Sequence, residues 1–150
     1  VAMAKIVVAS DHAGLILRAE AAKAAREAGH EVVDLGPADG QSVDYPNYAE
    51  KLTTELTAGR AALGILVCGT GIGMSIAANK VKGIRAAVCR TEYEARMARA
   101  HNDANVLCLG ERVTGLGVGA AIVKAFLESP FEGGRHQRRV DLIGALDQKR

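Results

Sequence analysis

Short apolar runs alternate with segments of helical spacing along the chain, with a period of about thirty residues. The apolar runs predict strands over residues 5–10, 31–35, 63–68, 84–89 and 105–109. The segments between and after them predict helices over 13–28, 46–58, 74–80, 91–100, 114–127 and 135–149. Strands that alternate with helices favour a parallel sheet with helices on both faces. The run at 63–68 is apolar throughout, which is typical of a strand covered on both sides.

Residues at the helix ends support these boundaries. Gly29 and Gly59 stand where glycines commonly end helices, and Pro46 falls in a predicted first turn. The segment Thr91-Glu92-Tyr93-Glu94 has the pattern of a capping box, and Thr114 is predicted to cap the next helix. The segment between Gly36 and Pro46 is polar and predicts a loop.

Composition narrows the class of protein. A chain of 150 residues corresponds to a single domain, 1–150, and 49% hydrophobic with 24% charged residues is typical of a globular protein. A net charge of +2 and an aromatic content of 3% argue against a nucleic-acid partner. No apolar run has membrane length and no signal peptide is evident, so no membrane partner is expected. Three cysteines outside CxxC spacing argue against disulfides and zinc, and favour a reducing cytoplasm.

The most informative segment follows the strand at 63–68. It reads Cys68-Gly69-Thr70-Gly71-Ile72-Gly73, and alternate glycines let backbone N–H groups turn toward an anion. A dinucleotide site is a weak match because Met74 stands where the third glycine belongs. Met74 also occupies the place of the arginine that a cysteine phosphatase needs. The third possibility is a loop that stabilises an oxyanion beside Cys68, since cysteines before helices ionise readily. A buried packing role is the alternative for Cys68.

Other polar residues follow the predicted strands and helices. Asp11 and His12 come after the first strand, where the parallel-sheet rule places ligands, although Asp11 could also cap the following helix. Arg112 follows the fifth strand and belongs to the same edge. His101 and Asn102 close the helix at 91–100, where a histidine also suits the helix dipole.

Two arginines begin the last helix. Arg135 and Arg139 are four residues apart and therefore share one helix face. A pair of guanidinium groups suits a phosphate, which accepts bidentate, charge-assisted hydrogen bonds. Cations at a helix N-terminus are electrostatically unfavourable, so this placement indicates function, although a solvated basic helix start is the simpler alternative.

Taken together, these motifs resemble the ribose-5-phosphate isomerase B family. The resemblance rests on Asp11-His12-Ala13-Gly14, Asp44-Tyr45-Pro46, the glycine loop, Ile76-Ala77-Ala78-Asn79-Lys80, His101-Asn102-Asp103 and Glu132-Gly133-Gly134-Arg135-His136 with Arg139. It covers nearly the whole chain, and the order and spacing of the motifs are specific. It implies a three-layer α/β/α sandwich around a Rossmann-like five-stranded parallel sheet. It also implies a homodimer or dimer of dimers that uses no metal and no other cofactor.

The resemblance also implies roles for individual residues. Cys68 matches the base that moves a proton between C1 and C2, and His101 matches the acid that opens the sugar ring, with Asp11 nearby. The remaining matches are the phosphate grip (His12, Arg112, Arg135 and Arg139), the loop that holds the enediolate oxygens (Gly69, Thr70, Gly71, Ile72 and Gly73), and the sugar contacts (Tyr45 and Asn102). The last helix, about 135–149, is expected to pack on a partner subunit.

The expected activity is therefore the interconversion of ribose 5-phosphate and ribulose 5-phosphate in the pentose phosphate pathway. Two alternatives remain. One is isomerisation of a six-carbon sugar phosphate, such as allose or galactose 6-phosphate. The other is a non-catalytic module that binds a phosphate or nucleotide with the same loop. Met74 argues against this alternative, because it stands where the dinucleotide-binding pattern has a glycine.

Overall fold

The computed structural model describes residues 2–150, and the predicted alternation of strands and helices is confirmed. In chain order the elements are β1 (Lys5–Ser10), α1 (Leu15–Glu27), β2 (Glu31–Asp34), α2 (Tyr45–Thr57), β3 (Leu63–Cys68), α3 (Ile72–Ala78), β4 (Ala86–Val88), α4 (Glu92–Asn102), β5 (Val106–Gly110), α5 (Leu116–Glu128) and α6 (Arg135–Asp147). The five strands form one parallel sheet in the order β2-β1-β3-β5-β4.

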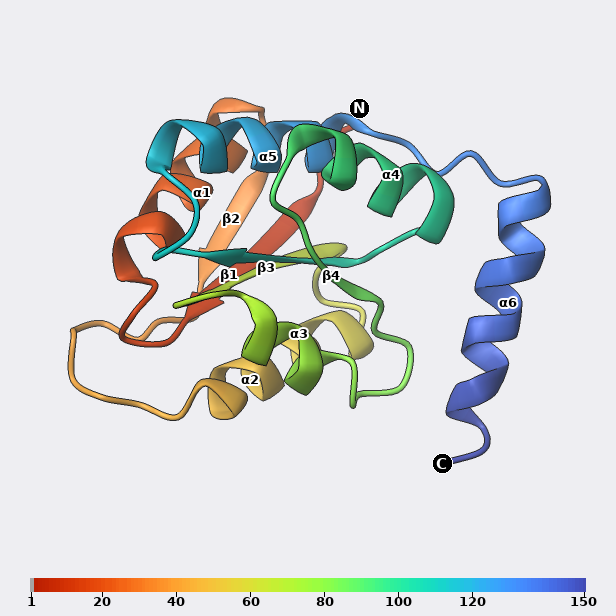
Figure 1. The fold of residues 1–150 in the computed structure, drawn as a ribbon, viewed down its shortest axis with the longest axis horizontal. Coiled ribbons are helices and arrows are strands. Elements are labelled where there is room, and N and C mark those ends of the chain that lie inside the picture. The colour runs from red at the N-terminus through yellow and green to blue at the C-terminus, as the bar shows by residue number, and fades with distance from the viewer. Residues whose placement is uncertain (1) are drawn as a thin grey trace.

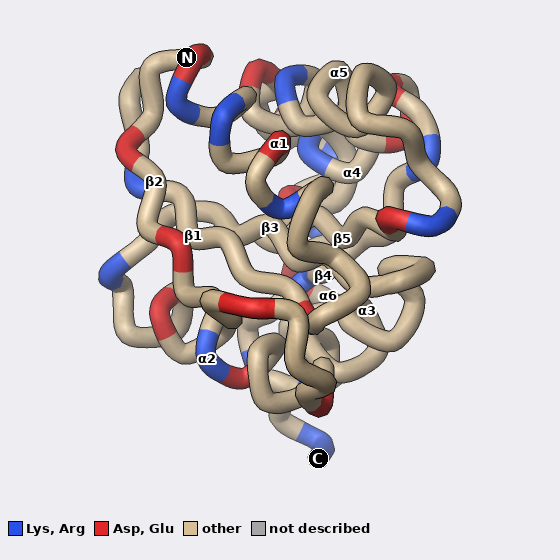
Figure 2. The backbone as a smooth tube through the Cα atoms, turned by 90° about the vertical axis from the view of Figure 1, so that its left-hand side faces the viewer, with Lys and Arg blue, Asp and Glu red and all other residues tan. Residues whose placement is uncertain are grey.

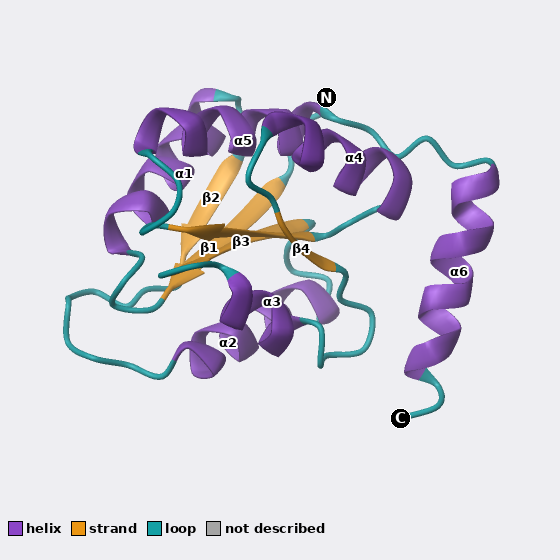
Figure 3. Ribbon diagram, in the orientation of Figure 1, coloured by secondary structure: helices purple, strands orange, loops and turns teal. Residues whose placement is uncertain are grey.

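Helices cover both faces of the sheet, as expected of a three-layer sandwich. Helices α1, α4 and α5 lie on one face, and α2 and α3 lie on the other (Figures 1 and 3). Alternate residues of β1 supply the two cores: Ile6 and Val8 pack toward the first set of helices, and Val7 and Ala9 toward the second. The central strand β3 is buried on both faces, as its apolar sequence predicts.

The capping predictions have mixed outcomes. Thr91 accepts a hydrogen bond from the Glu94 N–H at 3.1 Å, which confirms the cap of α4. The predicted cap of α5 is wrong, because Gly115 takes the N-cap position and Thr114 is buried before it. Helix α1 begins at Leu15 rather than at residue 13. The preceding residues form a turn instead, in which Asp11 Oδ1 accepts the Ala13 N–H at 2.9 Å.

Helix α6 stands beside the edge of the sandwich rather than in either layer, as Figure 1 shows. Its first turn packs on α4, and its end is tied to the loop after α3 by the Gly83 N–H, which donates to Asp147 at 2.8 Å. Leu142, Ile143 and Leu146 of this helix are between 43% and 58% exposed. Such a row of exposed apolar side chains on one helix is a candidate surface for contact with another molecule.

Candidate active site

The candidate active site lies at the carboxyl edge of the sheet, where β3 ends in Cys68. Strand pairing places Cys68 opposite Gly110, the last residue of β5. The glycine loop follows Cys68 and leads directly into α3, so the loop lies between two central strands and a helix N-terminus. This is the edge at which parallel α/β folds place their ligands.

The loop folds back over the thiol. The Gly71 N–H donates a hydrogen bond to Sγ of Cys68 at 3.1 Å, and the Ile72 N–H donates to Oγ1 of Thr70 at 3.2 Å. Gly73 and Met74 lie in the first turn of α3, where backbone N–H groups have no acceptor within the helix. The Thr70 hydroxyl accepts one bond here and keeps its own proton to donate. The arrangement places a thiol next to several donors suited to a developing oxyanion.

Glycine is required at two positions of this loop. Gly71 has φ +81°, a left-handed conformation that side chains rarely adopt. A Cβ at Gly73 would lie 2.7 Å from the ring of Tyr45, so the absence of a side chain lets the tyrosine approach the backbone. Tyr45 is the first residue of α2, and it thus covers the loop from the neighbouring helix.

Arg112 flanks the loop on the side of β5. Its guanidinium lies beside Gly69, where an added Cβ would be 3.2 Å from Nη1. The Arg112 N–H also donates to the Gly69 carbonyl at 3.0 Å, which fixes the backbone of the two segments together. The structure therefore brings a cation next to the glycine loop, as the phosphate-grip interpretation requires.

Asp11 and His12 occupy the same edge, beyond β1. Asp11 is 7% exposed, and its N–H donates to the Val67 carbonyl at 3.1 Å. Nδ1 of His12 accepts a hydrogen bond from the Val43 N–H at 3.1 Å, which leaves Nε2 available for another partner. The 36–44 loop therefore orients His12, a contact that the sequence did not predict.

Glu111 is a further residue whose part in the site sequence reasoning missed. Its Oε1 accepts the Leu17 N–H in the first turn of α1 at 2.8 Å, and its own N–H donates to the Cys68 carbonyl at 2.9 Å. A carboxylate at a helix N-terminus is favourable because it meets free N–H groups and the positive end of the dipole. The only available signal was its position directly after β5.

The other two cysteines, Cys89 and Cys108, are also buried. Burial raises the pKa of Cys89 to about 12, and burial likewise raises the pKa of the Cys108 thiol. Both environments disfavour the thiolate, which is the reactive form. All three cysteines are free.

The structure does not bring His101, Asn102, Arg135 and Arg139 to Cys68 within one chain. His101 and Asn102 end α4 beside the start of β5, whereas Cys68 lies opposite the end of that strand. The length of β5 corresponds to about 13 Å. Helix α6 carries Arg135 and Arg139 and begins next to His101, because His136 stacks on the His101 ring at a centroid distance of 4.1 Å.

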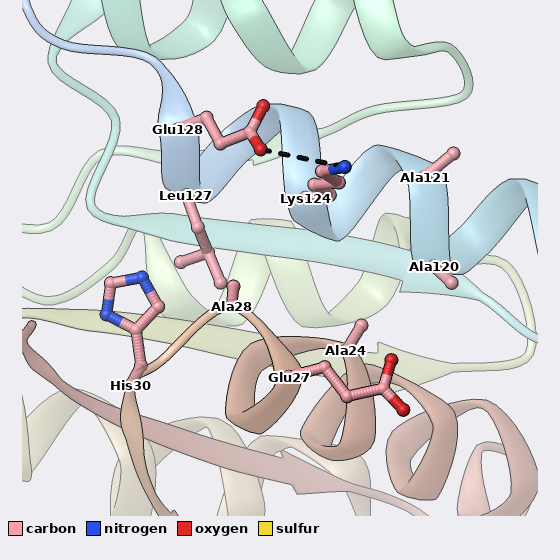
Figure 4. A pocket seen from close by; sticks show the side chains of 9 residues that line it. All are labelled: Ala24, Glu27, Ala28, His30, Ala120, Ala121, Lys124, Leu127 and Glu128. Atoms are coloured by element: carbon pink, nitrogen blue, oxygen red, sulfur yellow. Dashed lines mark ion pairs between the residues drawn. The ribbon is translucent and has the colours of Figure 1, made fainter.

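One hollow on the described surface lies elsewhere. It has a volume of about 610 Å³ and lies between the ends of α1 and α5, bordered by His30 and by an ion pair of Lys124 with Glu128 at 3.9 Å (Figure 4). A second hollow, of about 390 Å³, lies between α6 and the segment that leads into β4. Cys68 lines neither of these two hollows.

Fold and site together define a Rossmann-like α/β protein with a thiol and a glycine loop at the carboxyl edge of its sheet. The sequence profile of a family described as Ribose/Galactose Isomerase matches residues 6–143. The chain belongs to this family.

Individual relatives match this chain over nearly its full length. The chain is 48% identical to ribose-5-phosphate isomerase B of Escherichia coli K12, with 99% of each chain covered. It is 40% identical to ribose-5-P isomerase B of Listeria innocua, with 97% and 98% covered. The solved ribose-5-phosphate isomerase B of Clostridium thermocellum superposes with a TM-score of 0.94 at 50% identity, covering 97% of this chain and 98% of the other. The type B enzyme of Trypanosoma brucei gives 0.94 at 49% identity, with 97% and 99% covered.

Among the described residues, no helix is long and apolar enough to cross a membrane. Positively and negatively charged positions are interspersed along the backbone (Figure 2).

Proposed function

We propose that this protein interconverts ribose 5-phosphate and ribulose 5-phosphate through a cis-enediolate, with Cys68 as the general base. The observation that carries the proposal is the hydrogen bond from the Gly71 N–H to Sγ of Cys68. It joins the thiol to a loop that is rich in hydrogen-bond donors. A relative that bears the name ribose-5-phosphate isomerase B, at 48% identity over 99% of the chain, supports the substrate.

The proposed reaction divides into several steps. The phosphate fixes one end of the sugar, and a proton transfer from Asp11 or from His101 of the partner subunit opens the furanose. The Cys68 thiolate then takes the proton α to the carbonyl, and the electron pair moves onto the carbonyl oxygen. Donors of the glycine loop and the Thr70 hydroxyl stabilise that oxygen, and the proton returns to the neighbouring carbon.

The phosphate grip in this proposal comes from two subunits. His12 and Arg112 lie at the edge that carries Cys68, whereas Arg135 and Arg139 lie on α6, beyond reach within the chain. A partner's α6 that packs against this edge would complete the grip. The proposal is therefore a homodimer, or a dimer of dimers, in which each site takes its arginines from the neighbouring chain.

Exposed apolar side chains support such an interface. Ile72 and Ile76 of α3 are 50% and 59% exposed, and they stand next to the glycine loop. Leu142 and Leu146 of α6 are both 58% exposed. Burial of these two sets against each other across a two-fold axis would remove apolar area from water and place α6 near the partner's loop.

The test is isomerisation of ribose 5-phosphate in D2O, followed by mass and NMR analysis of the ketose. Proton transfer through an enediolate predicts ribulose 5-phosphate with solvent deuterium at C1, provided that the thiol exchanges with the solvent. The Thr70→Ala variant should lose roughly 10-fold or more in kcat because it lacks one oxyanion donor. Absence of any ketose would contradict the proposal and favour a non-catalytic phosphate-binding module.

A parallel measurement tests whether the protein prefers a five-carbon or a six-carbon sugar phosphate. The protein is incubated with ribose 5-phosphate, allose 6-phosphate and galactose 6-phosphate under the same conditions, and kcat/KM is compared. The proposal expects the five-carbon substrate to have the highest value. It also places the reaction in the pentose phosphate pathway of the cytoplasm and expects full activity after exhaustive chelation of metals.

A further inference from the structure

Arg18 is a buried charged side chain that the proposed reaction does not use. It lies in α1 and is only 9% exposed. Each nitrogen of its guanidinium has a partner: Nη1 donates to Oγ of Ser10 at 2.7 Å, Nη2 to the Pro37 carbonyl at 2.8 Å, and Nε to Oδ2 of Asp34 at 3.3 Å. A buried guanidinium is costly unless its donors are satisfied, and here three separate segments of the chain supply the acceptors.

These acceptors surround the beginning of the 36–44 loop, which leads from β2 to α2 (Figure 1). Ser10 ends β1, and Asp34 ends β2. Two further hydrogen bonds fix Gly36 in the same place: its N–H donates to Oδ1 of Asp34 at 2.8 Å, and its carbonyl accepts the Ser10 N–H at 3.1 Å. Arg18 therefore holds the loop against the end of β1.

The same loop contacts His12, a member of the proposed phosphate grip. The Val43 N–H donates to Nδ1 of His12 at 3.1 Å. An imidazole nitrogen that accepts a hydrogen bond carries no proton, so the neutral ring has its proton on Nε2, which can donate it to a phosphate oxygen. Val43 is six residues beyond Pro37, and His12 is two residues beyond Ser10. Arg18 thus joins the two segments whose later residues form this hydrogen bond.

We infer that Arg18 is a positioning residue for the substrate phosphate, and that it acts by fixing the 36–44 loop so that the loop orients His12. The inference rests on the proposed phosphate grip, in which His12 takes part. The His12 side chain is exposed, and among residues 2–150 the Val43 N–H is the hydrogen-bond partner that the structure gives to its ring. An exposed side chain without such a partner samples several rotamers, so its orientation in advance lowers the entropy cost of binding phosphate.

A purely structural role for Arg18 makes a different prediction. If the guanidinium only stabilises the fold, its loss lowers the free energy of unfolding and leaves the phosphate affinity of the folded protein unchanged. If it acts through His12, its loss weakens phosphate binding, and this effect disappears when the imidazole has also been removed. The energetic coupling between the two residues therefore separates the two roles.

The first experiment is a double-mutant cycle in the full chain. The dissociation constant of inorganic phosphate is measured by calorimetry for the wild type, Arg18→Met, His12→Ala and the double variant. Asp34→Asn carries the same cycle if Arg18→Met does not fold, because the Asp34 side chain is 37% exposed and an amide offers one acceptor oxygen where the carboxylate has two. The control is Arg60→Met, which removes the same charge from an exposed arginine that pairs with Glu55.

The inference predicts coupling between Arg18 and His12. His12→Ala should weaken phosphate binding about 10-fold or more, as expected for the loss of one charge-assisted hydrogen bond. Arg18→Met and Asp34→Asn should each weaken it about 3-fold or more, but by less than about 1.5-fold in the His12→Ala background. Arg60→Met should bind phosphate as the wild type does. Equal losses in the two backgrounds would overturn the inference. Unchanged binding in His12→Ala would show that the proposed phosphate grip is wrong at His12, and the inference would fall with it.

The second experiment depends neither on phosphate nor on catalysis. Hydrogen exchange of the Val43 amide is followed by NMR in the wild type, Arg18→Met, Asp34→Asn and Arg60→Met. The inference predicts exchange about 10-fold faster or more in the first two variants, because the released loop no longer holds the Val43 N–H against Nδ1 of His12. Arg60→Met should leave the exchange rate unchanged. Equal exchange of Val43 in the wild type and in Asp34→Asn would overturn the inference, even if the protein proves to be an active isomerase.

Discussion

The N–H of Gly71 and Sγ of Cys68 are joined by a hydrogen bond of 3.1 Å. This bond connects the proposed base to the loop proposed to hold the enediolate, so the two parts of the site share one backbone geometry. Gly71 maintains that geometry with φ +81° and with its Cα close to Leu109, whose carbonyl carbon would be 3.0 Å from an added Cβ. A change in the loop is therefore expected to displace the thiol.

Gly71→Ala tests this coupling. An added Cβ is strained at positive φ by about 1–2 kcal/mol, and it also contacts the backbone of β5. We expect the free energy of unfolding to fall by at least that amount and kcat to fall with it, measured by urea denaturation and by steady-state kinetics.

Gly117→Ala is the matched control. Gly117 lies in the first turn of α5 with nothing within 4 Å of an added Cβ. Alanine is a better helix former than glycine by up to about 1 kcal/mol, so this variant should be as stable as the wild type or more stable. Equal losses in both variants would contradict the special role of Gly71.

Glu111→Gln is expected to loosen the contact between α1 and the site. The change removes a negative charge that accepts the Leu17 N–H at 2.8 Å, so the helix N-terminus loses about 0.5–2 kcal/mol of stabilisation. Thermal unfolding should show a lower Tm. Glu128→Gln breaks only an exposed pair with Lys124 and should change stability by less than about 0.5 kcal/mol. An unchanged Tm in Glu111→Gln would show that the contact contributes nothing.

Arg139→Ala is expected to weaken the grip on the phosphate. A charge-assisted hydrogen bond contributes roughly 1.5–3 kcal/mol, so kcat/KM should fall about 10- to 150-fold. Arg139→Lys should recover only part of the loss, since an ammonium cannot form the bidentate fork.

The control for Arg139 is Arg138, which lies about 100° away around the helix. Both side chains are exposed, so a general effect of charge would appear in both variants. Arg138→Ala should keep a kcat/KM near that of the wild type. A similar loss in the two variants, or unchanged inhibition of Arg139→Ala by inorganic phosphate, would show that Arg139 does not grip the phosphate.

Mixing of inactive subunits tests whether two chains share each site. Cys68→Ala and Arg139→Ala chains are unfolded together, refolded in equal amounts and assayed. If a site takes Cys68 from one chain and Arg139 from the other, half of the dimers are mixed and each has one intact site. Activity should then return to about one quarter of the wild-type value. No recovery would mean that the two residues act within the same chain.

The sheet and the glycine loop could be predicted because their signals are local. Apolar runs of strand length, glycines at helix ends and the sequence after Cys68 each report on a few neighbouring residues. Parallel topology then places the end of β3 beside the end of β5, so the meeting of Cys68 with Arg112 follows from the pattern. The prediction that Thr114 caps α5 was wrong because Thr114 is buried before the helix begins. Burial, rather than its preference for capping, determines where this residue lies.

Contacts between distant segments could not be predicted in the same way. The stack of His136 on His101 depends on where the α5–α6 connection leads the chain, and no periodicity reports that path. The bond from Leu17 to Glu111 joins elements at opposite ends of the sequence. The distance between Cys68 and the arginines of α6 is likewise a property of the tertiary fold, and the completed site is a property of the proposed dimer.

The most direct test of the account is the turnover of Cys68→Ala with ribose 5-phosphate, measured beside Cys89→Ala. A positioned general base contributes about 10²–10⁴-fold, so Cys68→Ala should lose at least about 100-fold in kcat with little change in KM. Cys89 is buried, with its pKa raised to about 12, and its replacement should leave kcat nearly intact. Turnover near the wild-type value in Cys68→Ala would contradict the assignment of Cys68 as the base.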